Sequence, residues 1–315
     1  MRLILLGAGA FGLPSFRALA ARHEIATVIT QPDRPAGRRR KPKPTAIAEW
    51  AADAGLPVLR QGDVNEPAFV QQVGKLQADA AIVIAFGQKL GPELVTSLAP
   101  LAVNLHGSLL PAYRGAAPVN WAVIAGERET GNTVIGIAER MDAGRMYGQV
   151  RTAIDPLETA GELHDRLAAL GPDLLLDVLD RHAAGTLEPV PQDDTKATRA
   201  PKLSKADAWV DFTEPADRVR SRIHGLTPWP GVTVMWHHEG SEPQPLILRR
   251  VRDRPNEPAG QPPGTILPNH HVATGQGVIQ LLEVQPPGKR TMSITEFTRG
   301  HHLTPGDRFE SACSR

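Results

Sequence analysis

The first half of the chain alternates apolar runs with amphipathic stretches. Nearly uninterrupted apolar runs predict strands at residues 3–6, 25–30, 80–85, 102–105 and 133–137, and a helical periodicity predicts helices at 13–22, 45–54 and 160–182. Apolar strands separated by helices are typical of a parallel sheet that is buried on both faces. We therefore expect an α/β domain with a Rossmann-like open parallel sheet.

The pattern changes after residue 188. Residues 188–205 are polar and contain proline, which is typical of a linker. Beyond residue 207 only 215–224 has a helical pattern, and the β-prone pieces include 232–236, 245–251 and 278–284. Short strands broken by glycine and proline indicate a small β domain, for which a barrel is a common form. We expect one domain at 1–188, a linker at 189–206 and a C-terminal β domain at 207–315.

Composition narrows the class of protein. A chain of 315 residues with 41% hydrophobic content is long enough for two domains with buried cores. The net charge of +1 predicts no general affinity for nucleic acid, so any such surface must be local. Cys313 is the only cysteine, which excludes disulfides and cysteine-rich metal sites. No run of eighteen apolar residues exists, and the first predicted strand leaves no room for a signal peptide. We expect a cytoplasmic protein without a membrane partner.

A polar pair ends the apolar run at residues 101–103. Asn104 and His106 are two residues apart in a predicted strand, so their side chains point to the same side. Open α/β sheets present ligand-binding groups at the carboxyl ends of their strands. An asparagine amide can stabilise a developing oxyanion, and histidine carries protons near neutral pH. Downstream, the turn-rich segment 139–144 offers a carboxylate that can orient the imidazole. From the residues alone, Asp142 in this segment can also be interpreted as a turn former. The set suits attack of an amine on a carbonyl.

Residues 7–12, Gly-Ala-Gly-Ala-Phe-Gly, match the dinucleotide-binding fingerprint, because they follow a predicted strand and open a predicted helix. The alternative is that these glycines permit a tight turn and close packing. The second strand ends in Thr30-Gln31, without the acidic residue that would bind a ribose. Asp33 lies beyond it in a proline-rich segment. We interpret the turn as a packing feature and expect no NAD.

The segment 34–43 contains six basic residues and no acidic one. Its proline and glycine content predicts a loop, and a solvated surface loop is the plain alternative. The density of arginines and the position after a second strand favour phosphate binding, with Arg38, Arg39, Arg40 and Lys41 as candidates. A second basic set, which includes Arg249 and Arg250, is interpreted equally well as an extension of this surface or as an ordinary solvated face.

The run Val-Asn-Leu-His-Gly-Ser-Leu-Leu-Pro at 103–111, followed by Tyr-Arg-Gly-Ala-Ala-Pro at 113–118, resembles the formyltransferase family that uses 10-formyltetrahydrofolate. Gln-Pro-Asp-Arg-Pro-Ala-Gly-Arg at 31–38, Ala-Pro-Lys-Leu-Ser-Lys at 200–205 and Pro-Trp-Pro-Gly at 228–231 extend the resemblance to nearly the whole chain. It implies that Asn104, His106 and Asp142 are the catalytic residues. Arg145 departs from the family, in which an acid often follows the glycine.

The resemblance also implies substrates and their contacts. It implies transfer of a formyl group from 10-formyltetrahydrofolate to the amino group of an initiator methionyl-tRNA, by a monomer without a metal or NAD. Residues 207–315 would form an oligonucleotide-binding-like barrel, and the basic segment would reach the tRNA. The implied folate contacts are Ser108, Leu109, Leu110, Pro111, Phe86, Gly87 and Gln88. Phe86 is interpreted equally well as ordinary core.

Three other functions remain open at this stage. The catalytic residues fit equally a folate-dependent formyltransferase that acts on a nucleotide sugar or on glycinamide ribonucleotide. The glycine turn alone would fit a nicotinamide oxidoreductase. The basic segment alone would fit a non-catalytic RNA-binding protein. The basic segment, the linker and the β domain together favour tRNA as the acceptor.

Overall fold

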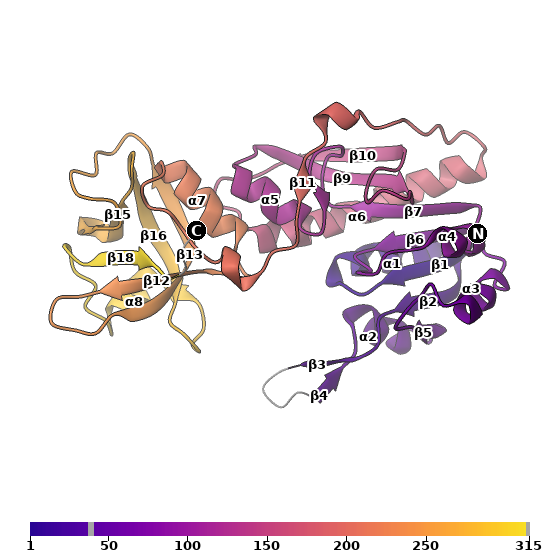
Figure 1. Ribbon diagram of the computed structural model, residues 1–315, viewed down its shortest axis with the longest axis horizontal. Coiled ribbons are helices and arrows are strands. Elements are labelled where there is room, and N and C mark those ends of the chain that lie inside the picture. Colours follow the sequence, from indigo (N-terminus) through magenta and orange to yellow (C-terminus); the bar gives the residue numbers. More distant parts are fainter. Residues whose placement is uncertain (37–40, 313–315) are drawn as a thin grey trace. The chain divides into compact units, whose positions relative to one another are not determined.

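The computed structural model describes residues 1–36 and 41–312, which divide into two compact units (Figure 1). The first unit consists of Met1–Gly115, Gly131–Arg151 and His164–Arg199. The second unit consists of Ala116–Thr130, Thr152–Leu163 and Ala200–Arg315. Each unit is therefore assembled from three separate stretches of chain.

The first unit is built on a seven-stranded sheet. In spatial order its strands are β10 (Met146–Ala153), β9 (Glu129–Gly136), β7 (Leu101–His106), β6 (Ala80–Ile84), β1 (Arg2–Gly7), β2 (Glu24–Thr30) and β5 (Val58–Arg60). Strands β5, β2, β1, β6 and β7 pair in parallel, but β9 pairs with β7 in the antiparallel direction. The predicted α/β class is confirmed, whereas the all-parallel sheet is wrong. The sheet is mixed, because a buried strand has the same apolar pattern in either direction.

Helices cover both faces of this sheet. They are α1 (Leu13–Arg22), α2 (Ala46–Asp53), α3 (Pro67–Gly74), α4 (Pro92–Leu98) and α6 (Ala160–Ala183). On one face Ile4 and Leu6 pack with α3 and α4. The alternate positions Leu3 and Leu5 face the other way and are fully buried. On that side α6 packs so closely that a Cβ at Gly171 would lie 2.7 Å from Leu105. None of the helices in the described stretches has both the length and the hydropathy to cross a bilayer.

The second unit is built on an antiparallel sheet. Its strands in spatial order are β14 (Ile266–Leu267), β15 (His271–Ala273), β16 (Val278–Gln285), β13 (Gln244–Arg254), β12 (Val232–His237) and β18 (Arg308–Ser311), and β17 (Met292–Ser293) pairs with β16. Helix α7 (Ala216–Gly225) buries Val219 and Ile223 against it. A short helix, α8 (Ile294–Thr298), follows β17. The elements predicted for this half are all present.

Helix α5 (Pro118–Ala125) belongs to this second core although it lies far from the β strands in sequence. Trp121 and Ile124 pack against the buried cluster of the sheet and α7. The Asn120 amide donates to the Gly225 carbonyl at 2.8 Å. A Cβ at Gly225 would lie 2.8 Å from the backbone nitrogen of Ile124. Glycine at the end of α7 therefore permits the two helices to touch.

Arg250 fastens a second distant stretch to the sheet. Its guanidinium on β13 donates to the Leu157 carbonyl and to the Glu162 carboxylate, each at 2.6 Å, and to the Glu283 carboxylate at 3.2 Å. Burial would raise the pKa of Glu162, but the hydrogen bonds from Arg250 and Thr159 prevail and lower it to about 2. Arg250 thus holds this stretch against the sheet, and a contact of its side chain with tRNA stays a prediction.

The ends of the antiparallel sheet approach each other. Thr265, beside β14, forms an isolated antiparallel bridge with Arg308 at the start of β18. Next to it the backbone nitrogen of Ile266 donates to the Asp307 carbonyl at 2.7 Å, and that of Phe309 donates to the Gly264 carbonyl at 2.8 Å. Each outermost strand therefore donates one backbone hydrogen bond to the residues that flank the other strand.

The basic segment is not entirely a loop. β3 (Arg34–Ala36) pairs antiparallel with β4 (Lys41–Lys43), and this ribbon extends away from the sheet of the first unit (Figure 1). The prediction of a loop is wrong for these six residues, because proline is tolerated in a two-stranded ribbon that has no further neighbours. Arg38, Arg39 and Arg40 lie outside the described residues.

Candidate active site

Strand β7 presents Asn104 and His106 at its carboxyl end. Asn104 is paired with Val83 of β6 on one side and Ile135 of β9 on the other, so it lies in the middle of the sheet. Its side chain is half-buried, and within the described part of the chain its carboxamide has no hydrogen-bond partner. An amide that is positioned by a strand but not engaged can donate to a ligand.

His106 is 5% exposed and is held from both sides of its ring. Nε2 lies 2.9 Å from the carbonyl oxygen of Tyr113, and since a carbonyl only accepts, Nε2 carries a proton. Nδ1 lies 3.7 Å from Oδ2 of Asp142. This distance allows an ion pair with a protonated imidazole but is too long for a hydrogen bond. The structure therefore brings Asp142 to the Nδ1 side of His106.

Asp142 reaches this position from the segment between β9 and β10. Its backbone is left-handed, with φ of 53°, a conformation that aspartate tolerates better than most residues. Its Oδ2 accepts a hydrogen bond from the backbone N–H of Gly115 at 2.8 Å. Two residues further, a Cβ at Gly144 would overlap the carbonyl of Gly136, so only glycine allows the segment to return along β9.

The loop after β7 contains the candidate folate residues Ser108, Leu109, Leu110 and Pro111. Ser108 is fully buried, and its hydroxyl donates to the Ala112 carbonyl at 2.7 Å. The hydroxyl of Thr133 on β9 donates to the Ser108 carbonyl at 2.7 Å and accepts from the Leu110 nitrogen at 3.1 Å. Thr133 thus fixes the loop beside the ends of β7 and β9.

Phe86, Gly87 and Gln88 follow β6, whose carboxyl end lies beside that of β7 because the two strands are parallel. Phe86 is 3% exposed and belongs to the core between the sheet, α3 and α4. The amide of Gln88 is engaged with the backbone of Gln61 at 2.9 Å and of Val64 at 3.2 Å. Both side chains already serve the fold, which supports the core interpretation of Phe86. A folate contact in this segment stays a prediction.

The glycine turn at 7–12 is occupied by packing. A Cβ at Gly7 would lie 2.6 Å from Cε2 of Phe16. The backbone nitrogens of Ala8 and Gly9, at 3.3 and 3.2 Å, both point to the carbonyl oxygen of Ala85. These N–H groups would face a phosphate in a dinucleotide site, but here they donate to the residue that follows β6. This supports the packing interpretation.

Two residues at the site carry no role in the sequence analysis. The side-chain amide of Gln192 donates to the Asp142 carbonyl at 2.8 Å, and the guanidinium of Arg114 donates to the Gln192 side-chain oxygen. Gln192 lies in the polar stretch expected to be a linker, where composition gives no signal. Arg114 lies in the motif at 113–118 that resembles the family, and this motif was the one sequence signal for a role of Arg114 at the site.

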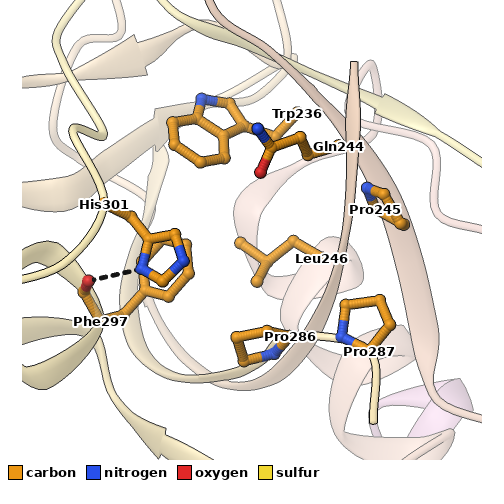
Figure 2. Close-up of a pocket in the computed structure, with 8 residues that line it drawn as sticks. All are labelled: Trp236, Gln244, Pro245, Leu246, Pro286, Pro287, Phe297 and His301. Carbon is orange, nitrogen blue, oxygen red and sulfur yellow. Dashed lines mark hydrogen bonds between the residues drawn. The ribbon is translucent and has the colours of Figure 1, made fainter. Parts of the chain in front are cut away.

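A separate pocket of about 160 Å³ lies in the second unit, between β12, β13, α8 and the turn after β16 (Figure 2). Its lining residues are Trp236, Gln244, Pro245, Leu246, Pro286, Pro287, Phe297 and His301. The ring of His301 stacks on Phe297 at 4.2 Å, and its Nδ1 donates to the Phe297 carbonyl at 3.0 Å. None of the candidate site residues lines this pocket. Across residues 1–36 and 41–312, no three metal-ligating side chains converge.

Comparison with known proteins follows the division of the chain. Residues 1–179 match the family described as Formyl transferase, and residues 202–302 match Formyl transferase, C-terminal domain. The chain is 42% identical over 323 residues to a methionyl-tRNA formyltransferase of Heliobacterium modesticaldum, which covers 98% of this chain and 100% of the relative. It is 40% identical to the protein of the same name from Roseiflexus castenholzii, with 98% of each chain covered.

Solved structures show the same fold at lower sequence identity. An N-formyltransferase from Helicobacter canadensis, in complex with folinic acid and dTDP-3-aminofucose, has a TM-score of 0.67 at 16% identity and covers 89% of this chain and 98% of its own. HypX from Aquifex aeolicus, in complex with tetrahydrofolic acid, has a TM-score of 0.61 at 16% identity and covers 95% of this chain and 47% of its own.

Proposed function

Because the chain belongs to the formyl transferase family, we propose that it transfers the formyl group of 10-formyltetrahydrofolate to the α-amino group of methionyl-initiator-tRNA. The product is N-formylmethionyl-tRNA for translation initiation. The observation that carries this proposal is about 40% identity over essentially the full length of methionyl-tRNA formyltransferases. The likeness to a sugar N-formyltransferase, at 16% identity, concerns the fold alone.

The residues at the end of β7 suit the developing negative charge. 10-Formyltetrahydrofolate supplies an activated formyl group whose leaving atom is N10. The free carboxamide of Asn104 donates to the formyl oxygen as charge accumulates on it. Protonated His106 is the second donor. Its Nε2 is engaged with Tyr113, so the Nδ1 side remains for the substrate.

Asp142 is the proposed proton carrier. Its carboxylate takes the proton of the attacking α-nitrogen through one water and returns a proton to the leaving N10. A bond forms between the α-nitrogen and the formyl carbon, the bond from that carbon to N10 breaks, and one proton moves between the two nitrogens. No oxidant or reductant is required. The same carboxylate lies 3.7 Å from Nδ1 of His106.

We further propose that Ser108, Leu109, Leu110 and Pro111 contact the folate together with the backbone near Gly87. The fixed position of the 108–111 loop beside β7 supports this assignment. Arg38, Arg39, Arg40 and Lys41 are proposed to bind tRNA phosphates, which the position of the β3–β4 ribbon outside the sheet supports.

We propose that residues 1–188 carry catalysis, that 189–206 connect the domains and that 207–315 form an oligonucleotide-binding-like barrel that contacts tRNA. The hydrogen bonds that join β14 and β18 to the residues flanking each other support closure of this sheet. We also propose that the protein is cytoplasmic, since its proposed product is used in translation initiation, and that it is a monomer.

One assay tests the function. The purified protein is incubated with 10-formyltetrahydrofolate and either methionyl-initiator-tRNA, a dTDP-amino sugar or glycinamide ribonucleotide, and the formylated product is quantified by mass spectrometry. We expect formylation of the aminoacyl-tRNA with a kcat/KM far above the other two. Formylation of only the sugar or the ribonucleotide would contradict the proposal.

A further inference from the structure

The side-chain amide of Gln192 uses its full hydrogen-bonding capacity. Nε2 donates to the carbonyl oxygens of Asp142 at 2.8 Å and Gly144 at 2.7 Å. Oε1 accepts from Nε of Arg114 at 3.0 Å and from Nη2 of the same guanidinium at 2.6 Å. An amide has two donor hydrogens and one acceptor oxygen with two lone pairs, so all are engaged. A flipped amide would face the guanidinium with its own hydrogens, so these partners fix its orientation.

The two segments that Gln192 joins meet again at the Asp142 carboxylate. One segment contains Asp142 itself, with its left-handed backbone. The other contains Gly115, which follows Arg114 and donates its N–H to Oδ2 of Asp142. That oxygen is also the atom that lies 3.7 Å from Nδ1 of His106. Gln192 therefore closes a ring of contacts that determines where the carboxylate sits relative to the imidazole.

The stretch that carries Gln192 is itself fastened to the first unit. Asp194 accepts from Arg114 at 2.7 Å and from Arg140 at 3.1 Å, and these hydrogen bonds lower the pKa of Asp194. Val190 and Met146 exchange backbone hydrogen bonds at 2.8 Å in both directions. The Arg114 side chain is 9% exposed, so its bonds to Gln192 are largely shielded from water.

We propose that Gln192 is a positioning residue for the reaction: it holds the Asp142 segment so that the carboxylate stays beside His106. This inference rests on the proposed function, in which Asp142 moves the proton. Gln192 touches neither the reacting atoms nor His106, and it acts only through the backbone carbonyls on either side of Ala143.

Two substitutions test this role. Gln192→Leu removes all four hydrogen bonds while keeping similar volume. Gln192→Glu keeps the acceptor for Arg114 but replaces both donors by an oxygen that faces two carbonyls. Both variants should lower kcat for formylation by about tenfold to a hundredfold, because small displacements of a reacting group have effects of this size. The KM values for both substrates should stay near those of the parent. Gln71→Leu, at an exposed position on α3, is the matched control and should be unchanged.

A spectroscopic readout separates this role from general stability. The imidazole ¹⁵N and ¹H resonances of His106, assigned by their loss in His106→Gln, should shift in both variants, whereas those of His224 should not. Unchanged His106 resonances, or a parental kcat in Gln192→Glu, would overturn the inference. If Gln192→Leu does not fold, the near-isosteric Gln192→Glu decides. If the His106 resonances shift but the parent formylates none of the acceptors, the proposed function fails. Gln192 then holds the Asp142 segment beside His106 but has no role in formyl transfer.

Discussion

Asn104 and His106 occupy equivalent positions at the end of β7 but are held in different ways. His106 is engaged with Tyr113 and faces Asp142, whereas the Asn104 amide has no partner among the residues that the structure describes. Asn104→Ala should therefore leave the Tm nearly unchanged. It should lower kcat by about a hundredfold to a thousandfold, since one oxyanion donor is lost.

Steady-state kinetics and thermal melting measure both effects. The control is Gln72→Ala, because Gln72 is exposed on α3 and is not among the residues proposed to contact a substrate. A large fall in Tm with parental kcat would make Asn104 a structural residue instead.

His224 gives the second unit a dependence on pH. Its Nε2 accepts from the Val251 nitrogen at 3.0 Å, so the ring is held neutral at 1% exposure. Burial, followed by the charges of Arg220 and Arg250, lowers the pKa of His224 to about 4, although a backbone hydrogen bond to Pro156 and the charge of Glu162 oppose this. The unfolded chain binds this proton near the ordinary value of 6.5, so protonation favours the unfolded state between pH 6.5 and 4.

Neutral His224 should therefore make its full contribution to the free energy of unfolding above pH 6.5. This free energy should fall as the pH drops from 6.5 toward 4. Between pH 7 and 5 the expected loss is about 2 kcal/mol from this residue. Urea unfolding of the parent and of His224→Gln, which keeps an acceptor for Val251 but does not titrate, measures the difference. Equal pH slopes for the two proteins would remove His224 as the cause.

At the scale of elements, the turn between β1 and α1 makes a prediction about packing. Gly7→Ala should lower the free energy of unfolding by about 1–3 kcal/mol, because its Cβ would lie 2.6 Å from Phe16 and 3.0 Å from the Ile84 carbonyl. Gly62→Ala is the matched control, since a Cβ there meets nothing within 4 Å.

The same turn should bind no dinucleotide. Calorimetry of the parent with NAD and NADP should show no binding, and micromolar affinity would contradict the interpretation of residues 7–12 as a packing feature.

The β3–β4 ribbon should act on tRNA and not on the folate. Replacing Arg38, Arg39, Arg40 and Lys41 together by glutamine should raise the KM for tRNA and flatten its dependence on salt, because fewer counterions are released on binding. The KM for 10-formyltetrahydrofolate should be unchanged. Neutralising the exposed Arg17, Lys75, Lys89 and Arg128, which removes the same four charges, is the control for total charge. Identical salt series for variant and parent would return the segment to an ordinary surface.

The sequence pattern predicted the strands whose buried residues are all apolar, and it missed strand residues that are buried but polar. The strands at residues 3–6 and 80–85 are apolar throughout, since helices cover both faces. The first half of β9, before the predicted strand at 133–137, was missed because Thr130 and Asn132 are polar yet almost fully or fully buried. Their partners, such as the Leu167 carbonyl for Asn132, lie far away in sequence. Burial of this kind has no local signature.

The same limit applied to the site. Asn104, His106 and Asp142 were recognisable from residue chemistry together with the resemblance to a family. Gln192 was not, because its partner Asp142 is 50 residues distant and its own surroundings are polar. A glutamine in such a stretch has the composition of a linker whether or not its amide is buried in a network.

At the scale of the whole molecule, the second unit depends on stretches that precede it in sequence. The cluster around α7 includes Trp121 and Ile124, and Arg250 requires the Leu157 carbonyl and Glu162 as partners. A fragment of residues 200–315 lacks these groups. It should bind the dye ANS and unfold at a lower temperature than the same unit in the full chain, because apolar surface of α7 becomes exposed.

Differential scanning calorimetry and dye fluorescence measure this difference. The comparison is with the full chain carrying Trp121→Ala, which removes one of the apolar contacts that the fragment lacks. A fragment with the full cooperativity and the Tm of the intact chain would show that residues 200–315 are self-sufficient.

The left-handed backbone at Asp142 limits which residues evolution can test at this position. Most L-residues disfavour that conformation by about 1–2 kcal/mol, whereas glycine, asparagine and aspartate adopt it readily. A mutation to alanine or glutamate therefore strains the segment in addition to changing its chemistry, and most single substitutions carry both penalties. The left-handed backbone therefore largely restricts position 142 to glycine, asparagine and aspartate, independently of their effect on activity. Of these three, only aspartate has a negative charge to place beside His106.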